Sequence, residues 1–572
     1  MSKLNSILNK SFCKRVLLPS ICLYCMSASA FAQTQLGEDI DGEATGDESG
    51  YGVSLSSDGY RMAVGAITND GNGNNSGQVR VYQWSNTTWE QLGSDIYGEA
   101  TGDLIGFPVS LSSDGNRLAI GSSQNDGNGE DSGHVRVFQW MDSTWVQLGE
   151  DIDGEAVFDG SGSAISLSSD GTRLAIGARF NWNSQGIQSG HVRVYQWSGM
   201  AWDQLGIDID GEASEDQFGR MLSLSSDGNR VAVGAPYSDV NGVNSGQVSV
   251  FQWTGAAWTQ IGIDLNGEAA GARFGESVSL SSDGNRLAIG AIGESGSSWD
   301  RSGHVRIFQW TDTTWIQLGN DIDGETANDF FGVSTSWSES GNRLAISAIG
   351  DDGNGENSGQ VRVYQWSNSD WEQLGSDING EAPGDRSGDS VSLSSDGNRL
   401  AIGATGNDGN GDESGHVRVF DLSMFNVFQI NAGLNDAWYN PDTSGQGFFI
   451  TVFPDLGYVS LAWFTYDTDL PPIDATANLG DPGHRWLTAG GPIDGDKALM
   501  NIELTSGGIF DTTSEITRTD PPGSDGTILL TFDGCNSGTV EYDIPSINSQ
   551  GVVPIQRVAN DNIVLCEVLG VD

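Results

Sequence analysis

Glycine-rich loops with oxygen-bearing side chains at alternate positions are the part of this sequence best suited to binding chemistry. The pattern Asp-Gly-Asn-Gly, followed by Asn, Asp or Glu, occurs four times. It resembles the first half of an EF-hand loop, in which alternate side chains point to one centre and glycine permits a tight curl. The bidentate glutamate that completes such a loop is missing, so the match is partial. We therefore predict calcium ligands at Asp70, Asn72, Asn74, Asp126, Asn128, Glu130, Asp352, Asn354, Glu356, Asp408, Asn410 and Asp412.

A second acidic pattern, Asp-Ile-Asp-Gly-Glu, recurs at residues 39–43, 151–155, 208–212 and 321–325, with close relatives elsewhere. Like charges gathered on one surface repel each other unless an ion bridges them or solvent screens them. We therefore hypothesise that a hard divalent cation orders the two sets of loops. The alternative is that glycine-rich turns merely happen to be acidic.

The histidines do not indicate catalysis. Catalysis needs one convergent set of distinct residues, whereas the notable groups of this chain recur in every unit. Exchange of histidine for glutamine at one position of the unit is typical of a polar strand start, not of a ligand or a base. We predict no catalytic residue, no cofactor other than calcium, and no enzyme activity. The alternating residues at this position are His134, His191, His304 and His416 on one hand and Gln78, Gln247 and Gln360 on the other.

These loops belong to a unit that occurs seven times with a nearly constant period. The position of its turn is marked by Asp58, Asp114, Asp170, Asp227, Asp283, Ser340 and Asp396. Every unit contains strand signals only, as in the second unit at 109–112, 117–121, 135–140 and 145–152. Four antiparallel strands in sequence make one blade of a β-propeller, and seven blades are within the usual range.

The two ends of the repeat region complement each other. Residues 35–40 correspond to the fourth strand of a blade without the preceding three, whereas the seventh unit ends after its third strand at 417–422. If the N-terminal strand completes the last sheet, no blade keeps an open edge. The sequence thus predicts an all-β fold, a seven-bladed propeller closed by an N-terminal strand.

The units resemble FG-GAP repeats, the propeller repeats of integrin α-chains and of many bacterial secreted proteins. Phe218-Gly219 with Gly234-Ala235-Pro236 is the fullest match, and Phe274-Gly275 and Phe331-Gly332 start similar units. The resemblance implies an extracellular recognition module, often adhesive. Integrin calcium loops lie in the first hairpin of a blade, where this chain has only Ser-Asp-Gly-Asn, so that site is not transferred.

The chain is expected to have three parts: a signal peptide at 1–32, the propeller at 33–426 and a second β domain at 427–572. The first part has a basic start, a short apolar run and the cleavage pattern Ala30-Phe31-Ala32. Strand-like runs separated by glycine and proline predict a small antiparallel sandwich or barrel at the C-terminus, tied by a Cys535–Cys566 disulfide. Its aromatic-rich sequences are Ala437-Trp438-Tyr439-Asn440-Pro441, Ser444-Gly445-Gln446-Gly447-Phe448 and Ala462-Trp463-Phe464-Thr465-Tyr466. They resemble a C-terminal module of gammaproteobacterial secreted proteins.

The formal net charge of −51 excludes nucleic acid as a partner, and no later run of about 20 apolar residues could span a membrane. The protein is expected to be secreted, periplasmic or at the cell surface. The favoured function is extracellular recognition or adhesion, in which a propeller face binds a surface protein or a polysaccharide. The alternatives are an inert acidic component of an envelope or matrix and a secreted glycan-active enzyme.

Overall fold

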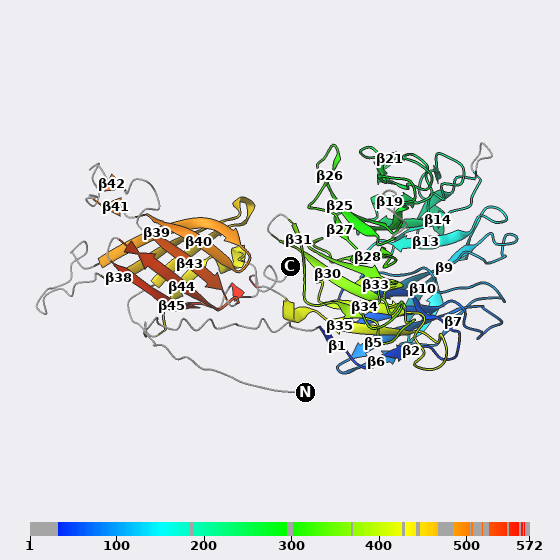
Figure 1. Cartoon of the computed structure of the whole chain (residues 1–572), viewed down its shortest axis with the longest axis horizontal. Coiled ribbons are helices and arrows are strands. Elements are labelled where there is room, and N and C mark those ends of the chain that lie inside the picture. The colour runs from blue at the N-terminus through cyan, green and yellow to red at the C-terminus, as the bar shows by residue number, and fades with distance from the viewer. Residues whose placement is uncertain are drawn as a thin grey trace, which may run out of the picture.

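The computed structural model shows two all-β units, a propeller and a barrel (Figure 1). The structure describes residues 33–559, except 183–187, 294–300, 368–369, 426–429, 442–446, 467–483, 504, 507–516, 519–525, 533 and 546–547, together with 562, 563 and 566. The predicted signal peptide at 1–32 therefore lies outside the described residues. No helix in the described part of the chain is long and apolar enough to cross a membrane.

Each blade is an antiparallel sheet of five strands. In the second blade, β9 (Arg117–Ser122) pairs with β8 (Val109–Leu111) and with β10 (His134–Met141). The predicted fourth strand is divided into β11 (Thr144–Gln147) and β12 (Ile152–Asp153), and both halves pair with β10. The other blades repeat this order from the innermost strand outwards.

The remaining strands of the complete blades follow the same period. Blade 1 has β3 (Ser49–Leu55), β4 (Arg61–Ala66), β5 (Gln78–Ser85), β6 (Thr88–Gln91) and β7 (Ile96–Tyr97). Blades 3 and 4 have β13 (Ser161–Leu167), β14 (Arg173–Ala178), β15 (His191–Trp197), β16 (Trp202–Gln204), β17 (Ile209–Asp210), β18 (Met221–Leu224), β19 (Arg230–Ala235), β20 (Gln247–Trp253), β21 (Trp258–Gln260) and β22 (Leu265–Asn266). Blades 5 and 6 have β23 (Phe274–Leu280), β24 (Arg286–Ala291), β25 (His304–Trp310), β26 (Trp315–Gln317), β27 (Ile322–Asp323), β28 (Phe331–Trp337), β29 (Arg343–Ala348), β30 (Gln360–Ser367), β31 (Asp370–Gln373) and β32 (Ile378–Asn379).

The seventh blade joins the two ends of the repeat region, as predicted. It contains β33 (Ser390–Leu393), β34 (Arg399–Ala404) and β35 (His416–Asp421), and its outer strands β1 (Thr34–Gln35) and β2 (Ile40–Asp41) come from the N-terminal segment. Both N-terminal strands pair antiparallel with β35, as β11 and β12 pair with β10. Ile40 is buried in the same cluster as Val417 and Val419 of β35. The ring is thus closed by backbone pairing and apolar packing.

Paired tryptophans connect blades 1 to 6 to the preceding blade. Trp84 and Trp89 lie with ring centroids 5.2 Å apart, and the Trp89 indole donates a hydrogen bond of 3.1 Å to the Leu36 carbonyl of the preceding sheet. Nearer the axis the backbones almost touch, since a Cβ on Gly177 would stand 2.0 Å from the Gly219 carbonyl oxygen of the next blade. Glycine is required there because nothing larger fits.

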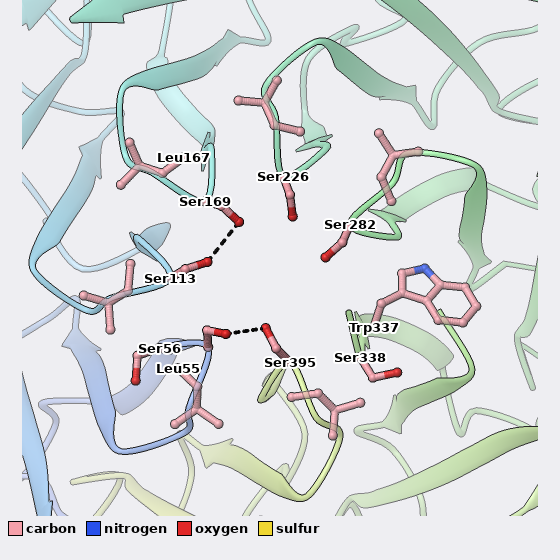
Figure 2. A pocket seen from close by; sticks show the side chains of 15 residues that line it. Leu55, Ser56, Ser113, Leu167, Ser169, Ser226, Ser282, Trp337, Ser338 and Ser395 are labelled. Carbon is pink, nitrogen blue, oxygen red and sulfur yellow. Dashed lines mark hydrogen bonds between the residues drawn. The ribbon is translucent and has the colours of Figure 1, made fainter. Parts of the chain in front are cut away.

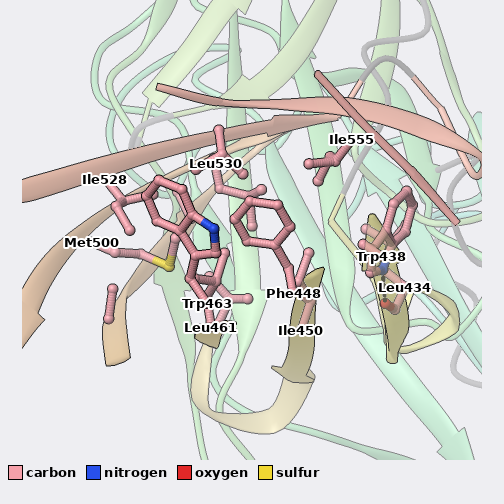
Figure 3. Close-up of a cluster of buried hydrophobic side chains, with 14 of the residues drawn as sticks. Leu434, Trp438, Phe448, Ile450, Leu461, Trp463, Met500, Ile528, Leu530 and Ile555 are labelled. Carbon is pink, nitrogen blue, oxygen red and sulfur yellow. Dashed lines mark hydrogen bonds between the residues drawn. The ribbon is translucent and has the colours of Figure 1, made fainter. Parts of the chain in front are cut away.

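The C-terminal unit is a closed antiparallel barrel, which decides between the two predicted architectures. Its core contains Trp438, Phe448 and Trp463, so these aromatic side chains are structural (Figure 3). Cys535 and Cys566 form the predicted disulfide. The barrel strands are β36 (Asp436–Tyr439), β37 (Gly447–Phe453), β38 (Tyr458–Tyr466), β39 (His484–Asp494), β40 (Lys497–Glu503), β43 (Thr527–Phe532), β44 (Ser537–Ile544) and β45 (Ser549–Arg557); β41 (Thr505–Ser506) pairs with β42 (Thr517–Arg518), and the 3-10 turns are η1 (Ser423–Phe425), η2 (Ala432–Leu434) and η3 (Pro454–Leu456).

Candidate functional site

Two faces of the propeller differ in chemistry. The turns after the innermost strands form one face, here called the hairpin face. The loops between the second and third strands and the connections between blades form the opposite face, here called the loop face. This division follows from the antiparallel order of the strands, because successive connections alternate between the two ends of a sheet.

The turn aspartates of the hairpin face are structural. Asp114 accepts hydrogen bonds from the Ser112 hydroxyl at 2.7 Å and from the Asn116 backbone N–H at 2.9 Å. Burial acts to raise the pKa of Asp114, but these hydrogen bonds outweigh it and hold the pKa below its usual value. The following Arg117 donates to the Gly171 carbonyl of the next blade at 2.8 Å. The repeated turn therefore shapes the hairpin and ties neighbouring blades together.

A cavity of about 160 Å³ opens at the centre of the hairpin face (Figure 2). Its lining consists of serines, leucines and one tryptophan, so it offers hydroxyl groups and no charge. The Ser113 and Ser169 hydroxyls lie 2.9 Å apart, and those of Ser57 and Ser395 lie 2.8 Å apart. Four of the eight lining serine hydroxyls pair with one another and the lining carries no charge, so we do not place the functional site there.

The two acidic patterns meet on the loop face. In the first blade the Asn72 side-chain amide donates hydrogen bonds to the carbonyls of Gly98 at 2.7 Å and Glu99 at 3.2 Å. The loop between the second and third strands is thereby tied to the connection that leads to the next blade. The same tie recurs as Asn128 to Gly154, Asn241 to Gly267, Asn354 to Gly380 and Asn410 to Gly42.

All twelve predicted calcium ligands are exposed on the loop face. One oxygen of Asp70 accepts the Asn75 backbone N–H at 2.8 Å, and the Asn72 amide nitrogen is used in the tie between loops. One carboxylate oxygen of Asp70 and the carbonyl oxygen of Asn72 are left outside these bonds. Carboxylate and amide oxygens are the donors that calcium prefers, so the chemistry of the loops fits the ion.

Three groups of histidine, aspartate and glutamate lie beside these loops, and the sequence reasoning missed them. In each group the potential ligand atoms lie within 4.8 Å of one another. The sequence does contain a signal for these groups, namely a constant spacing between the histidine and the aspartate. The spacing from His134 to Asp151 equals that from His191 to Asp208. In the seventh blade, closure of the ring supplies the aspartates. The groups are Glu99, His134 and Asp151; Glu155, His191 and Asp208; and Asp39, Asp41 and His416.

The histidines in these groups are neutral at pH 7. His191 is 1% exposed, and neither of its ring nitrogens has a hydrogen-bond partner among the described residues. Burial and the nearby Arg193 lower its pKa to about 4, although Asp208 lies 3.9 Å away. Arg193 also lies 3.5 Å from Glu155 of the same group. A guanidinium so close to the carboxylate competes with a metal ion, so we keep the exposed loops as the candidate cation site.

Two loops, at 179–182 and 298–301, depart from the repeated loop sequence, and the second falls largely outside the described residues. Ser298, Trp299 and Asp300 are not described. Trp182 of the other loop is 58% exposed on the loop face, whereas the Arg179 side chain stacks on the Phe180 ring at 4.7 Å.

Three segments of the chain, 40–82, 208–251 and 379–420, match the family model of the FG-GAP repeat. No curated protein matches the chain. Among solved structures, the periplasmic gluconolactonase of Pseudomonas aeruginosa is 17% identical with a TM-score of 0.39, over 58% of this chain and 85% of that one. Raptor of Chaetomium thermophilum is 14% identical with a TM-score of 0.44, over 68% of this chain and 29% of that one. U3-55K is 11% identical with a TM-score of 0.41, over 68% and 98% of the two chains.

Proposed function

We propose that this protein, whose propeller is built from FG-GAP repeats, is an extracellular recognition protein without enzyme activity. Its loop face binds a surface protein or a polysaccharide, and calcium held by the acidic loops contributes to that binding. The propeller serves as a rigid frame that presents equivalent loops around one face.

The observation that carries the proposal is the exposure of uncompensated carboxylates on the loop face. Asp70, Asp126, Asp352 and Asp408 are exposed, and none forms an ion pair in the described part of the chain. Repulsion within such a surface is relieved when a divalent cation binds, and a bound cation can also contact an anionic group of a partner. The repetition of these groups in several blades favours multipoint binding over a single catalytic centre.

Four substitutions test the role of the loops. They are Asp70→Asn, Asp126→Asn, Asp352→Asn and Asp408→Asn. Each keeps a side-chain oxygen for the backbone hydrogen bond of its loop and removes the charge. We expect the combined variant to bind calcium at least about tenfold more weakly than the natural chain, because each lost carboxylate removes a charged ligand. Isothermal titration of the full chain with calcium measures this difference.

A matched control removes four exposed charges elsewhere on the propeller. The replaced residues lie on outer strands or on the hairpin face. The substitutions are Glu90→Gln, Asp142→Asn, Asp203→Asn and Glu372→Gln. Calcium affinity equal in both combined variants would contradict the proposal. A screen of the full chain against extracellular polysaccharides and surface proteins, with calcium and with chelator, then identifies the partner. Release of reducing sugar in that screen would favour the glycan-active alternative.

A further inference from the structure

One position of the repeat differs in every blade. It directly follows the glycine at the inner, loop-face end of each blade, where the innermost strand starts. A structural position in a repeat largely keeps its residue type, as the turn position does with aspartate in six of seven units, whereas this position includes hydroxyl, aromatic, aliphatic, acidic and basic side chains. The seven residues in blade order are Tyr51, Phe107, Ser163, Arg220, Glu276, Val333 and Asp389.

The fold brings these unlike residues together. The innermost strands of neighbouring blades pack against each other all the way around the ring, including β33 against β3. The Tyr51 and Phe107 rings lie 5.1 Å apart, although they belong to different blades. Arg220 donates to the Glu276 carboxylate of the next blade at 2.9 Å. The residues thus surround the propeller axis at the centre of the loop face.

Arginines gather at the same place. Residues 33–426 contain 18 arginines, of which 13 occupy two repeated positions of the blade. We call the other five the central arginine cluster: Arg179, Arg220, Arg273, Arg301 and Arg386.

The contacts of the cluster join several blades. Arg220 and Arg273 both lie against the Tyr237 ring, at 5.7 and 5.1 Å from its centroid. Arg301 lies against the Phe330 ring of the next blade, at 6.0 Å. In a chain of net charge −51, four of these five arginines therefore lie at or beside the seven inner positions, and Arg301 lies against the residue that precedes the innermost strand of blade 6.

The charges of the cluster do not balance. Arg220 pairs with Glu276, and Arg386 pairs with Asp389 at 3.3 Å. Arg179 has no ion pair within the described residues, and its Nε is buried without a hydrogen-bond partner there. Burial and the neighbouring Arg220 lower the pKa of Arg179. A partly buried guanidinium that repels its neighbour gains most from an anion placed between the two.

Acceptor groups and aromatic rings complete the site. The Glu276 side chain is 10% exposed, and its second oxygen has no hydrogen-bond partner in the described part of the chain. Such an oxygen can accept a hydrogen bond from a ligand hydroxyl. The Tyr51 and Phe107 rings, at the same inner position of blades 1 and 2, offer an apolar surface, which suits the face of a sugar ring.

We propose that the central arginine cluster binds the carboxylate of an acidic sugar, a hexuronate. Arg179 receives the carboxylate, because a planar guanidinium matches its two oxygens. Arg220, which already donates to Glu276 and Gln217, adds a second positive charge nearby. Glu276 accepts a sugar hydroxyl, and the aromatic rings contact the sugar face. This site is separate from the exposed acidic loops and needs no metal ion, so it goes beyond the cation-dependent recognition proposed above.

The test titrates the full chain, in the presence of chelator, with sodium glucuronate, with glucose and with inorganic phosphate. We expect saturable millimolar binding of glucuronate and none of glucose. Absence of glucuronate binding would overturn the proposal, and equally tight phosphate binding would overturn the assignment to a sugar carboxylate. An oligomer of glucuronate that binds more tightly than the monomer would identify a polysaccharide as its source.

The decisive variant is Arg179→Gln, because Arg179 has no ion pair to break in the described residues. We expect at least about a tenfold loss of glucuronate affinity with no decrease in melting temperature. The control is Lys497→Gln, which removes one exposed positive charge from the barrel. It should leave the glucuronate affinity and the melting temperature unchanged. A variant that melts earlier and still binds glucuronate would show that Arg179 is only structural. Loss of calcium binding in the loop variants would not affect this titration, so the two proposals fail separately.

Discussion

Replacing Ile40 by alanine should destabilise the chain as much as replacing Ile152 by alanine, although Ile40 stands close to the predicted cleavage point. Both isoleucines start the outer half-strand of a blade and are 7% exposed. Truncation of a buried isoleucine to alanine costs about 2–5 kcal/mol in free energy of unfolding. Denaturant unfolding followed by tryptophan fluorescence measures both variants.

The comparison is informative because Ile152 belongs to a blade whose strands are continuous in sequence. If the N-terminal segment closes the ring, its isoleucine contributes as an ordinary core residue does. A neutral Ile40→Ala combined with a costly Ile152→Ala would contradict closure. Deletion of residues 33–42 should go further, because it exposes the edge of β35 and promotes aggregation. A synthetic peptide of those residues should restore the melting temperature.

The buried histidines should contribute less to the stability of the folded chain as the pH is lowered from 6.5 to 4. Burial and neighbouring arginines lower the pKa of both His191 and His416 from 6.5 to about 4. Because the folded-state pKa lies below that of the unfolded chain, the unfolded chain binds more protons in this range. The contribution of each histidine to the free energy of unfolding is fully present above pH 6.5 and is lost as the pH falls towards 4. It amounts to at most about 3 kcal/mol.

The double variant His191→Gln and His416→Gln isolates this effect. Glutamine occupies the same position in blades 1, 4 and 6, so it fits the site. The unfolding free energy of the natural chain should fall relative to that of the variant as the pH falls from 6.5 to 4, since all other groups titrate in both. A difference between the two chains that does not change with pH would contradict a buried neutral histidine.

The period of the repeat was sufficient to predict the ring. Turn aspartates at nearly equal intervals define equivalent strands, and the missing fourth strand of the last unit identifies its N-terminal replacement. The structure divides the fourth strand of each blade into two short strands. The residue pattern does not reveal this division, because both halves pair with the same third strand and differ only in the position at which they pair.

The candidate sites were less accessible to sequence reasoning. The loops could be placed on one face from strand order alone, but the Asn72 amide turns towards Gly98 and Glu99, and side-chain orientation is not readable from spacing. The pairing of Arg220 with Glu276 joins equivalent positions of two successive units, so it exists only once the blades have packed together. A search for repeats does not detect positions that vary between units, although these positions distinguish this propeller from a ring of identical blades.

A crystal structure of the full chain grown with calcium tests the central claim most directly. We predict calcium density at the loop face, between an Asp-Gly-Asn-Gly loop and the adjoining connection between blades, in contact with Asp126, Asp352 or Asp408. Crystals saturated with calcium that show ordered loops and no ion at these residues would contradict the claim that the loop face is a cation-dependent recognition surface.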